Sequence, residues 1–316
     1  MQVFHSLEEL PPGFGPSLVA IGNFDGFHRA HAHMLQTIVE RARKQDLQSA
    51  AVSFEPHPGR ILRPDKQLKL LTPTTEKISL LASTGLDFLL LLPFTRELSV
   101  MPARQFAHAV LEAGLHAREV HEGYNFRFGH KAEGNVDRLA EFGREMGFTV
   151  KLYPEMRLRG EPVSSSHIRD LLRAGAVSRA RRLLGRPYSI VSGPEAGRGY
   201  GSKYTVPTIN LRPYPELLPK DGVYITRTRV GSEDFGSVSN LGNRPTFGAE
   251  SFAIETHLLD FHPLELTADT RVEITFLARL RDEIKFASSE RLRDQIGRDV
   301  AKTRRYFRRL PPRPIP

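Results

Sequence analysis

The chain has 316 residues, 40% of them hydrophobic and 26% charged, a composition typical of a globular protein with room for two domains. It contains no cysteine, which excludes disulfides, cysteine–zinc sites and thiolate nucleophiles. The net charge of +9 fits either nucleic-acid binding or sites for small polyanions, and short arginine clusters at predicted helix ends favour the second. No signal sequence or membrane-length apolar run is apparent, so we expect a cytoplasmic protein.

Short apolar runs alternate with amphipathic patterns in the first half of the chain. The runs predict strands at 17–22, 49–54, 87–94, 118–122 and 148–153, and the 3.6-residue periodicity predicts helices at 30–44, 74–84, 101–113 and 135–146. Repeated strand–helix units indicate an α/β fold with a parallel sheet. In such sheets ligands bind beyond the carboxyl ends of the strands.

A glycine-flanked turn follows the first of these strands and leads into a helix. The turn consists of Gly22, Asn23, Phe24, Asp25 and Gly26. His28 and His31 come next, three residues apart, so they face the same side of the first helical turn. Because the first N–H groups of a helix lack internal partners, this pattern favours bound phosphates. The alternative is an ordinary strand–helix turn whose histidines have no role.

Other polar loops follow later strands of the same half. His57 lies between two prolines after the second strand, and Asn125 follows the fourth, beside Phe126 and Phe128, which we leave unassigned. Ser165 and Ser166 open a helix that carries Arg169 about one turn later. Two hydroxyls and a guanidinium suit a phosphate clamp, although a serine at a helix start is also ordinary capping.

The pattern changes near residue 186, where a helical segment at 177–185 ends. Alternating strands are predicted at 223–230, 235–240, 253–259 and 272–277, followed by an amphipathic helix at 288–307. Short strands with one helix suggest a small antiparallel β-barrel. We therefore place one domain at 1–186 and a second at 187–316.

Polar residues of the second half suggest a further site. Thr208 and Asn210 alternate along an extended segment, so their oxygens point the same way and could hold Mg²⁺, although two polar residues on a strand face need have no such role. A glycine-rich stretch at 193–201, including Gly199, could wrap phosphates with its N–H groups. Glu255 lies in a strand pattern whose default interpretation is a solvated carboxylate.

Both halves resemble known families. GNFDGFH, PHP, GYNFRFG and SSHIR resemble, in order, the motifs of the flavin-adenylating nucleotidyltransferases, and GRPY, VPTINL, DGVY, NLGNRPTF and IETH resemble those of riboflavin kinase. The whole chain is similar to the bifunctional riboflavin kinase/FAD synthetase family. The resemblance implies a Rossmann-like N-terminal domain that transfers AMP from ATP to FMN, giving FAD, and a C-terminal barrel that phosphorylates riboflavin to FMN with Mg²⁺.

The resemblance also implies residue roles. His28, His31 and Arg169 would stabilise the developing charge, with Asn125, His57 and the serines binding substrate. Glu255 would accept the proton of the riboflavin hydroxyl, and Thr208 and Asn210 would hold Mg²⁺. The chain departs from the family pattern at Ala30 and at Thr205-Val206.

Two alternatives stay open: a chain that keeps only one of the two activities, and a basic nucleic-acid-binding protein. We expect small-molecule partners and neither nucleic acid nor membrane, and the sequence does not predict an oligomeric state.

Overall fold

The computed structural model describes residues 1–195, 208–244, 251–264 and 266–309. By packing, the chain divides into two units, Met1–Ser165 and Ser166–Pro316. None of the helices within the described ranges has the length and apolar character of a membrane span.

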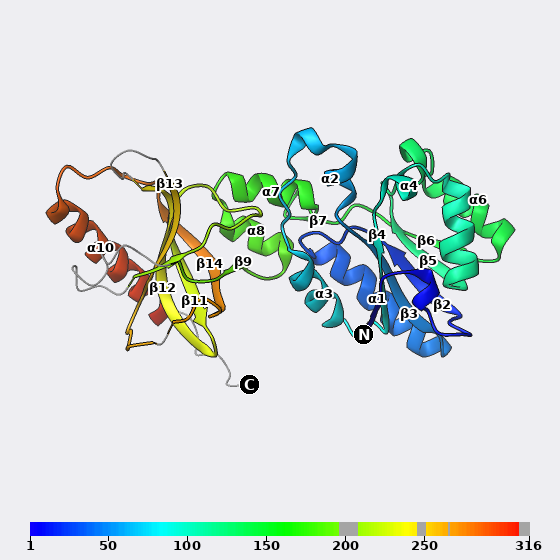
Figure 1. Ribbon diagram of the computed structural model, residues 1–316, viewed down its shortest axis with the longest axis horizontal. Coiled ribbons are helices and arrows are strands. Elements are labelled where there is room, and N and C mark those ends of the chain that lie inside the picture. Colours follow the sequence, from blue (N-terminus) through cyan, green and yellow to red (C-terminus); the bar gives the residue numbers. More distant parts are fainter. Residues whose placement is uncertain (196–207, 245–250, 265, 310–316) are drawn as a thin grey trace. The chain divides into compact units, whose positions relative to one another are not determined.

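A parallel sheet forms the centre of the first unit (Figure 1). Its strands are β1 Gln2–Phe4, β2 Ser17–Ile21, β3 Gln48–Glu55, β4 Phe88–Pro93, β5 Ala117–Gly123 and β6 Thr149–Tyr153. They are arranged in the order β1-β4-β3-β2-β5-β6, and every neighbouring pair is parallel. The predicted α/β fold is confirmed. The edge strand β1 was not predicted, because three residues are too few to show a periodicity.

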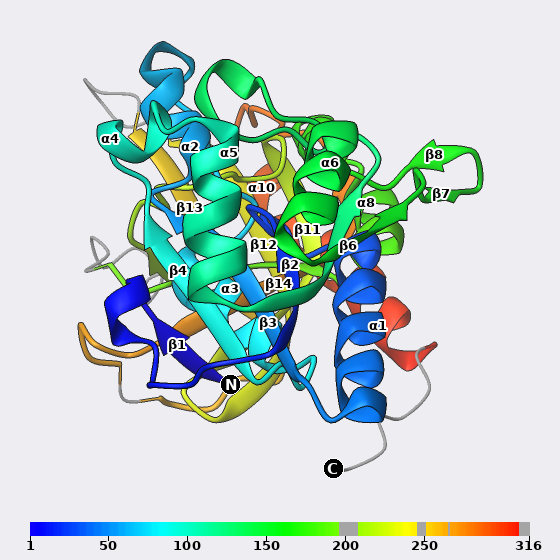
Figure 2. The same ribbon diagram turned by 90° about the vertical axis from the view of Figure 1, so that its right-hand side faces the viewer.

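Helices cover both faces of this sheet. They are α1 Arg29–Gln45, α2 Pro58–Leu62, α3 Thr74–Ala82, α4 Arg96–Ser99, α5 Ala103–Phe106, a π-helix at Ala107–Gly114 and α6 Val136–Met146, with 3-10 turns at Leu7–Glu9, Pro64–Lys66 and His130–Ala132. Helices α1 and α3 pack on one face, and α5, the π-helix and α6 pack on the other (Figure 2). A small hairpin, β7 Arg157–Leu158 with β8 Glu161–Pro162, precedes the end of the unit.

The strand order reverses direction between β2 and β5. The chain winds outward from β2 through β3 and β4 on one side, and continues to β5 and β6 on the other. The connections that leave the carboxyl ends of β2 and β5 therefore run to opposite sides, and doubly wound sheets bind ligands at such a point. The predicted phosphate turn is the loop that leaves β2.

The second unit begins with two helices and continues as an antiparallel sheet. Its elements are α7 Ser165–Arg173, α8 Val177–Leu184, β9 Tyr188–Ser192, β10 Thr208–Leu211, β11 Gly222–Val230, β12 Glu233–Arg244, β13 Ser251–Leu258, β14 Val272–Arg281 and α10 Ser289–Arg308. The sheet order is β10-β13-β12-β11-β14-β9. Helix α8 packs on β14 and β9, and α10 packs on β12.

The two edges of this sheet meet, as a barrel requires. Directly after β9, the backbone N–H of Glu195 donates to the Asn210 carbonyl at 2.7 Å, and the Arg212 N–H donates to the Gly193 carbonyl at 2.9 Å. These bonds join the continuation of β9 to β10, so the predicted antiparallel barrel with a terminal helix is confirmed. The extended segment predicted around Thr208 and Asn210 is β10, whereas β9 was not predicted.

Candidate active sites

The loop after β2 holds an uncommon backbone conformation. Phe24 and Phe27 have φ of 48° and 36°, and Gly26 has φ of 80°. A Cβ atom on Gly26 would lie 2.6 Å from Cδ1 of Leu71, so a larger residue would not fit there. Such conformations persist only where the surroundings enforce them. The loop is therefore held in a defined shape.

Hydrogen bonds of Asp25 stabilise much of this loop conformation. Its side chain is 3% exposed, and its Oδ1 accepts the backbone N–H groups of Leu71 at 2.9 Å and Thr72 at 3.0 Å. Its backbone carbonyl accepts the hydroxyl of Ser165 at 2.7 Å, which brings the start of α7 to the loop. Asp25 therefore links the loop after β2 to the segment at Leu71 and to Ser165. Its carboxylate accepts hydrogen bonds from the protein backbone.

His28 and His31 lie together at the N-terminus of α1. His28 is the N-cap, and its Nδ1 accepts the backbone N–H of His31 at 3.4 Å. The two rings stack with centroids 3.7 Å apart and an interplanar angle of 18°. Burial, and secondarily the neighbouring His28, holds the pKa of His31 well below its usual value. Among the described residues, Nδ1 of His31 is buried without a hydrogen-bond partner.

The remaining loop residues take different positions. His57 is the N-cap of α2, and its Nδ1 accepts the Gly59 N–H at 2.9 Å. Asn125 is exposed in the turn after β5. Phe128 belongs to the core between the sheet and the helices, and Phe126 stacks on it at 5.2 Å. Of these two aromatic residues, left unassigned from the sequence, Phe128 is a core residue and Phe126 is a half-buried residue packed against the core.

Helix α7 carries the rest of the predicted phosphate clamp. Ser166 is exposed, whereas Arg169 is 8% exposed, one turn beyond Ser165. Ser165 is the last residue of the first unit, and Ser166 and Arg169 belong to the second.

Sequence reasoning missed Glu122, the second-to-last residue of β5. The side chain is 2% exposed, and its Oε1 accepts the Ile21 N–H at 2.8 Å. Burial raises the pKa of this carboxyl well above its usual range. Little in the sequence indicated it, because β5 also carries the charged residues Arg118 and Glu119, which are exposed and half-buried.

In the second unit, the pairing of strands β10, β13 and β12 places the predicted kinase residues in one row across the sheet. Asn210 on β10 pairs with Glu255 on β13, which pairs with Asn240 on β12. Paired residues of antiparallel strands share a face, with Cβ atoms roughly 5 Å apart. Thr208 lies on the same face, two residues from Asn210 and opposite His257. Among the described residues, Oδ1 of Asn240 is buried without a partner. Gly199, Thr205 and Val206 lie outside the described residues.

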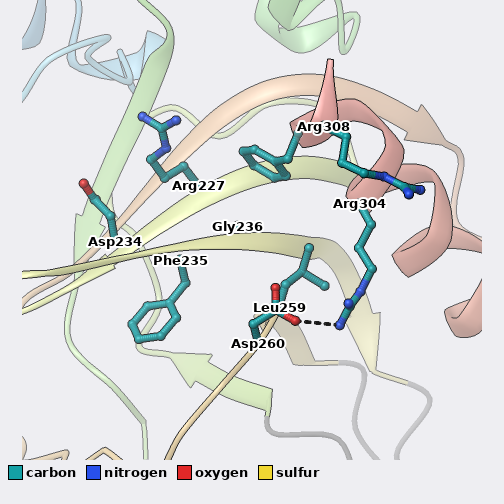
Figure 3. Close-up of a pocket in the computed structure, with 9 residues that line it drawn as sticks. Arg227, Asp234, Phe235, Gly236, Leu259, Asp260, Arg304 and Arg308 are labelled. Atoms are coloured by element: carbon teal, nitrogen blue, oxygen red, sulfur yellow. Dashed lines mark ion pairs between the residues drawn. The ribbon is translucent and has the colours of Figure 1, made fainter. Parts of the chain in front are cut away.

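A pocket of about 690 Å³ opens elsewhere on the second unit (Figure 3). It is lined by Arg227, Asp234, Phe235, Gly236, Leu259, Asp260, Arg304, Phe307 and Arg308. Arg304 of α10 extends to Asp260, with 2.8 Å between them (Figure 3). Gly236 precedes Asn240 by four strand residues, about 13 Å, so this pocket is separate from the row that contains Glu255.

Comparisons with known proteins match both halves of the chain. The FAD synthetase family model matches residues 13–167, and the riboflavin kinase model matches residues 184–307. The bifunctional riboflavin kinase/FMN adenylyltransferase of Pseudomonas fluorescens is 33% identical over 305 residues, which cover 96% of this chain and 97% of that protein. The protein of the same description from Escherichia coli K12 is 32% identical over 308 residues, which cover 96% of each chain.

A solved structure is also similar. The crystal structure described as a macrolide-efflux protein from Streptococcus pneumoniae superposes with a TM-score of 0.85 at 25% identity, and the match covers 96% of this chain and 98% of that one. The order of the two family models, and relatives that match over nearly their whole length, lead to one assignment. The chain belongs to the bifunctional riboflavin kinase/FMN adenylyltransferase family.

Proposed function

We propose that the domain at 1–186 transfers AMP from ATP to FMN, giving FAD and pyrophosphate. The observation that carries this proposal is the stacked pair of His28 and His31 over a helix N-terminus at the point where the strand order reverses. An FMN phosphate oxygen attacks the α-phosphorus of ATP, the bond to the bridging oxygen breaks, and pyrophosphate leaves. The protein supplies alignment and charge stabilisation.

Each residue has a proposed part in that transfer. His28 and His31 donate ring N–H groups to phosphate oxygens as negative charge develops, because a neutral imidazole keeps one donor. Arg169 binds phosphate oxygens with its guanidinium, and Ser165, Ser166, Asn125 and His57 position the substrates. The loop from Gly22 through Asn23, Phe24 and Asp25 to Gly26 presents its backbone to the triphosphate, in a shape that the Asp25 contacts support.

For the second unit we propose transfer of the ATP γ-phosphoryl group to the 5′-hydroxyl of riboflavin. Glu255 accepts the hydroxyl proton, and its place in a row with Asn210 and Asn240 supports this role. The hydroxyl of Thr208 and the amide oxygen of Asn210 are hard ligands on one face, which fits Mg²⁺ bound together with nucleotide phosphates. When bound, the ion would neutralise phosphate charge. Gly199 is proposed to contact phosphate.

The two reactions are proposed to follow one another, since FMN is the product of the second unit and the substrate of the first. We propose working domains of 1–186 and 187–316 for adenylylation and phosphorylation, and a cytoplasmic location. The partners are riboflavin, FMN and ATP.

One incubation tests the whole proposal. The purified chain is given riboflavin, ATP and Mg²⁺, or FMN, ATP and Mg²⁺, and the flavins are separated by chromatography. We expect FMN and FAD from the first mixture and FAD from the second. If riboflavin were not converted to FMN, the kinase assignment would be wrong. If FMN were not converted to FAD, the adenylyltransferase assignment would be wrong.

A further inference from the structure

Lys77 is a buried cation on the face of α3 that packs against the sheet. Its side chain is 5% exposed, and the other buried residue of α3, Leu81, lies one turn later. An ammonium group is seldom buried unless it has partners, because leaving water without compensation costs several kcal/mol. The contacts of Lys77 therefore indicate why a cation stands at this position.

Those contacts lead to the loop after β2. Nζ of Lys77 donates to Oγ of Ser53 at 3.2 Å and to the carbonyl of Phe54 at 3.3 Å. The Ser53 hydroxyl, itself fully buried, donates to the carbonyl of Asn23 at 3.5 Å. A chain of hydrogen bonds thus runs from α3, through the end of β3, to the second residue of the loop.

Two carboxylates beside this lysine have further hydrogen bonds of their own. The hydroxyl of Thr74 donates to Oε2 of Glu55, and Asp25 accepts two backbone N–H groups. Burial lowers the pKa of Lys77, and the charges of Glu55 and Asp25 oppose that shift. A nearby positive charge would be enough to neutralise these two acids. The hydrogen bonds of Lys77 do more, because they connect it to Ser53 and, through Ser53, to the loop after β2.

The direction of the Asn23 carbonyl has a consequence for the loop. In a trans peptide the N–H of the following residue points opposite to the carbonyl. With the Asn23 carbonyl directed to Ser53, the N–H of Phe24 is directed away from the end of β3. A fixed peptide orientation in a phosphate-binding loop presents a donor in place, without a cost of ordering when the ligand binds.

We propose that Lys77 is a positioning residue for the adenylyl transfer, which acts through Ser53 to fix the Asn23–Phe24 peptide of the loop that binds the ATP phosphates. The fixed peptide favours the triphosphate because its N–H donor needs no ordering when the ligand binds. This inference rests on the function proposed for the first unit.

The test compares variants of the full chain. Lys77→Met removes the charge and keeps a long apolar side chain, Ser53→Ala removes the connecting hydroxyl, and the double variant combines them. Lys44→Met, at an exposed position near the C-terminus of α1, is the matched control. For each we would measure kcat and KM for ATP in FAD formation from FMN, riboflavin phosphorylation, and the melting temperature.

We expect Lys77→Met to raise the KM for ATP about 10-fold or more, the scale of one lost charge-assisted hydrogen bond. Ser53→Ala should shift KM in the same direction, and the double variant should show less than the sum of the two free-energy changes, because both act through one chain of contacts. Riboflavin phosphorylation and the Lys44→Met protein should be unchanged.

A purely structural lysine would give a different result. The melting temperature would fall while the KM for ATP stayed within about twofold of the unmodified chain, or the two substitutions would be additive, and either outcome overturns the inference. Should Lys77→Met fail to fold, Ser53→Ala still decides by its KM. An unmodified chain that forms no FAD would instead contradict the function on which the inference rests.

Discussion

The backbone N–H of Ile21 donates to the carboxyl of Glu122 at 2.8 Å, which links the ends of β2 and β5 across the point where the strand order reverses. Burial raises the pKa of Glu122 well above its reference value of 4.5, so the folded chain holds a proton there that the unfolded chain releases at lower pH. The contribution of Glu122 to the free energy of unfolding is therefore fully present below pH 4.5, and it is lost as pH rises through the folded-state pKa.

Glu122→Gln should therefore stabilise the chain increasingly as pH rises. The amide keeps the shape and the acceptor for Ile21 but cannot ionise, so the pH-dependent loss disappears. Melting temperatures measured from pH 5 to 8 should diverge in favour of the variant as pH increases. A variant that melts lower than the unmodified chain across this range would contradict a protonated Glu122.

His121 should give a dependence of the opposite sign. Its Nδ1 lies 2.9 Å from the Tyr153 hydroxyl and its Nε2 lies 3.2 Å from Glu119, and burial lowers its pKa below 6.5 despite the attraction of Glu119. The unfolded chain then binds the proton first, so stability is full above pH 6.5 and is lost as pH falls through the folded-state pKa. Thermal unfolding of His121→Gln should show a smaller loss between pH 7.5 and 5.5; equal slopes would exclude His121 as the source.

Replacing His28 should separate the two activities. His28→Ala removes a donor at the start of α1, and we expect FAD formation to fall about 100- to 1,000-fold while FMN accumulates from riboflavin. His33→Ala, exposed on the same helix, is the control and should retain FAD formation. Unchanged FAD output from His28→Ala would remove this histidine from the mechanism.

Glu255→Gln should have the reverse effect. Without a base at this position we expect riboflavin phosphorylation to fall about 100- to 10,000-fold, while added FMN is still converted to FAD. Glu233→Gln, at an exposed position that begins β12, is the control. Near-normal turnover of Glu255→Gln would mean that another group or water takes the proton.

The fragment 187–316 should be less stable than the fragment 166–316. Helix α8 buries Val177, Ala180, Leu183 and Leu184 and packs on β14 and β9, so a chain that begins at 187 exposes those strands. Burial of each larger apolar side chain contributes about 1.5–3 kcal/mol, an upper range. The denaturation midpoints of the two fragments provide the measurement, and equal midpoints would show that α8 contributes nothing to the second unit.

Much of the fold follows from local patterns. Short apolar runs predicted the strands β2 to β6 of the first sheet, and the apolar stripe predicted α1, because the pattern of apolar residues indicates which faces are buried. The short strands β1 and β9 were missed, since a few residues contain too little of a pattern. The order of motifs predicted both activities without any contact being known.

The state of individual side chains was decided by contacts between distant segments. Glu122 meets Ile21 across 101 residues of chain, and Asp25 meets Leu71 across 46. The sequence therefore predicted a phosphate-binding loop after β2, whereas the tertiary structure decided that the Asp25 carboxylate faces backbone, that burial raises the pKa of Glu122 and that Lys77 is buried. The physical reason is that periodicity is a local property, while burial and partners, which set charge and orientation, depend on which strands the topology makes neighbours.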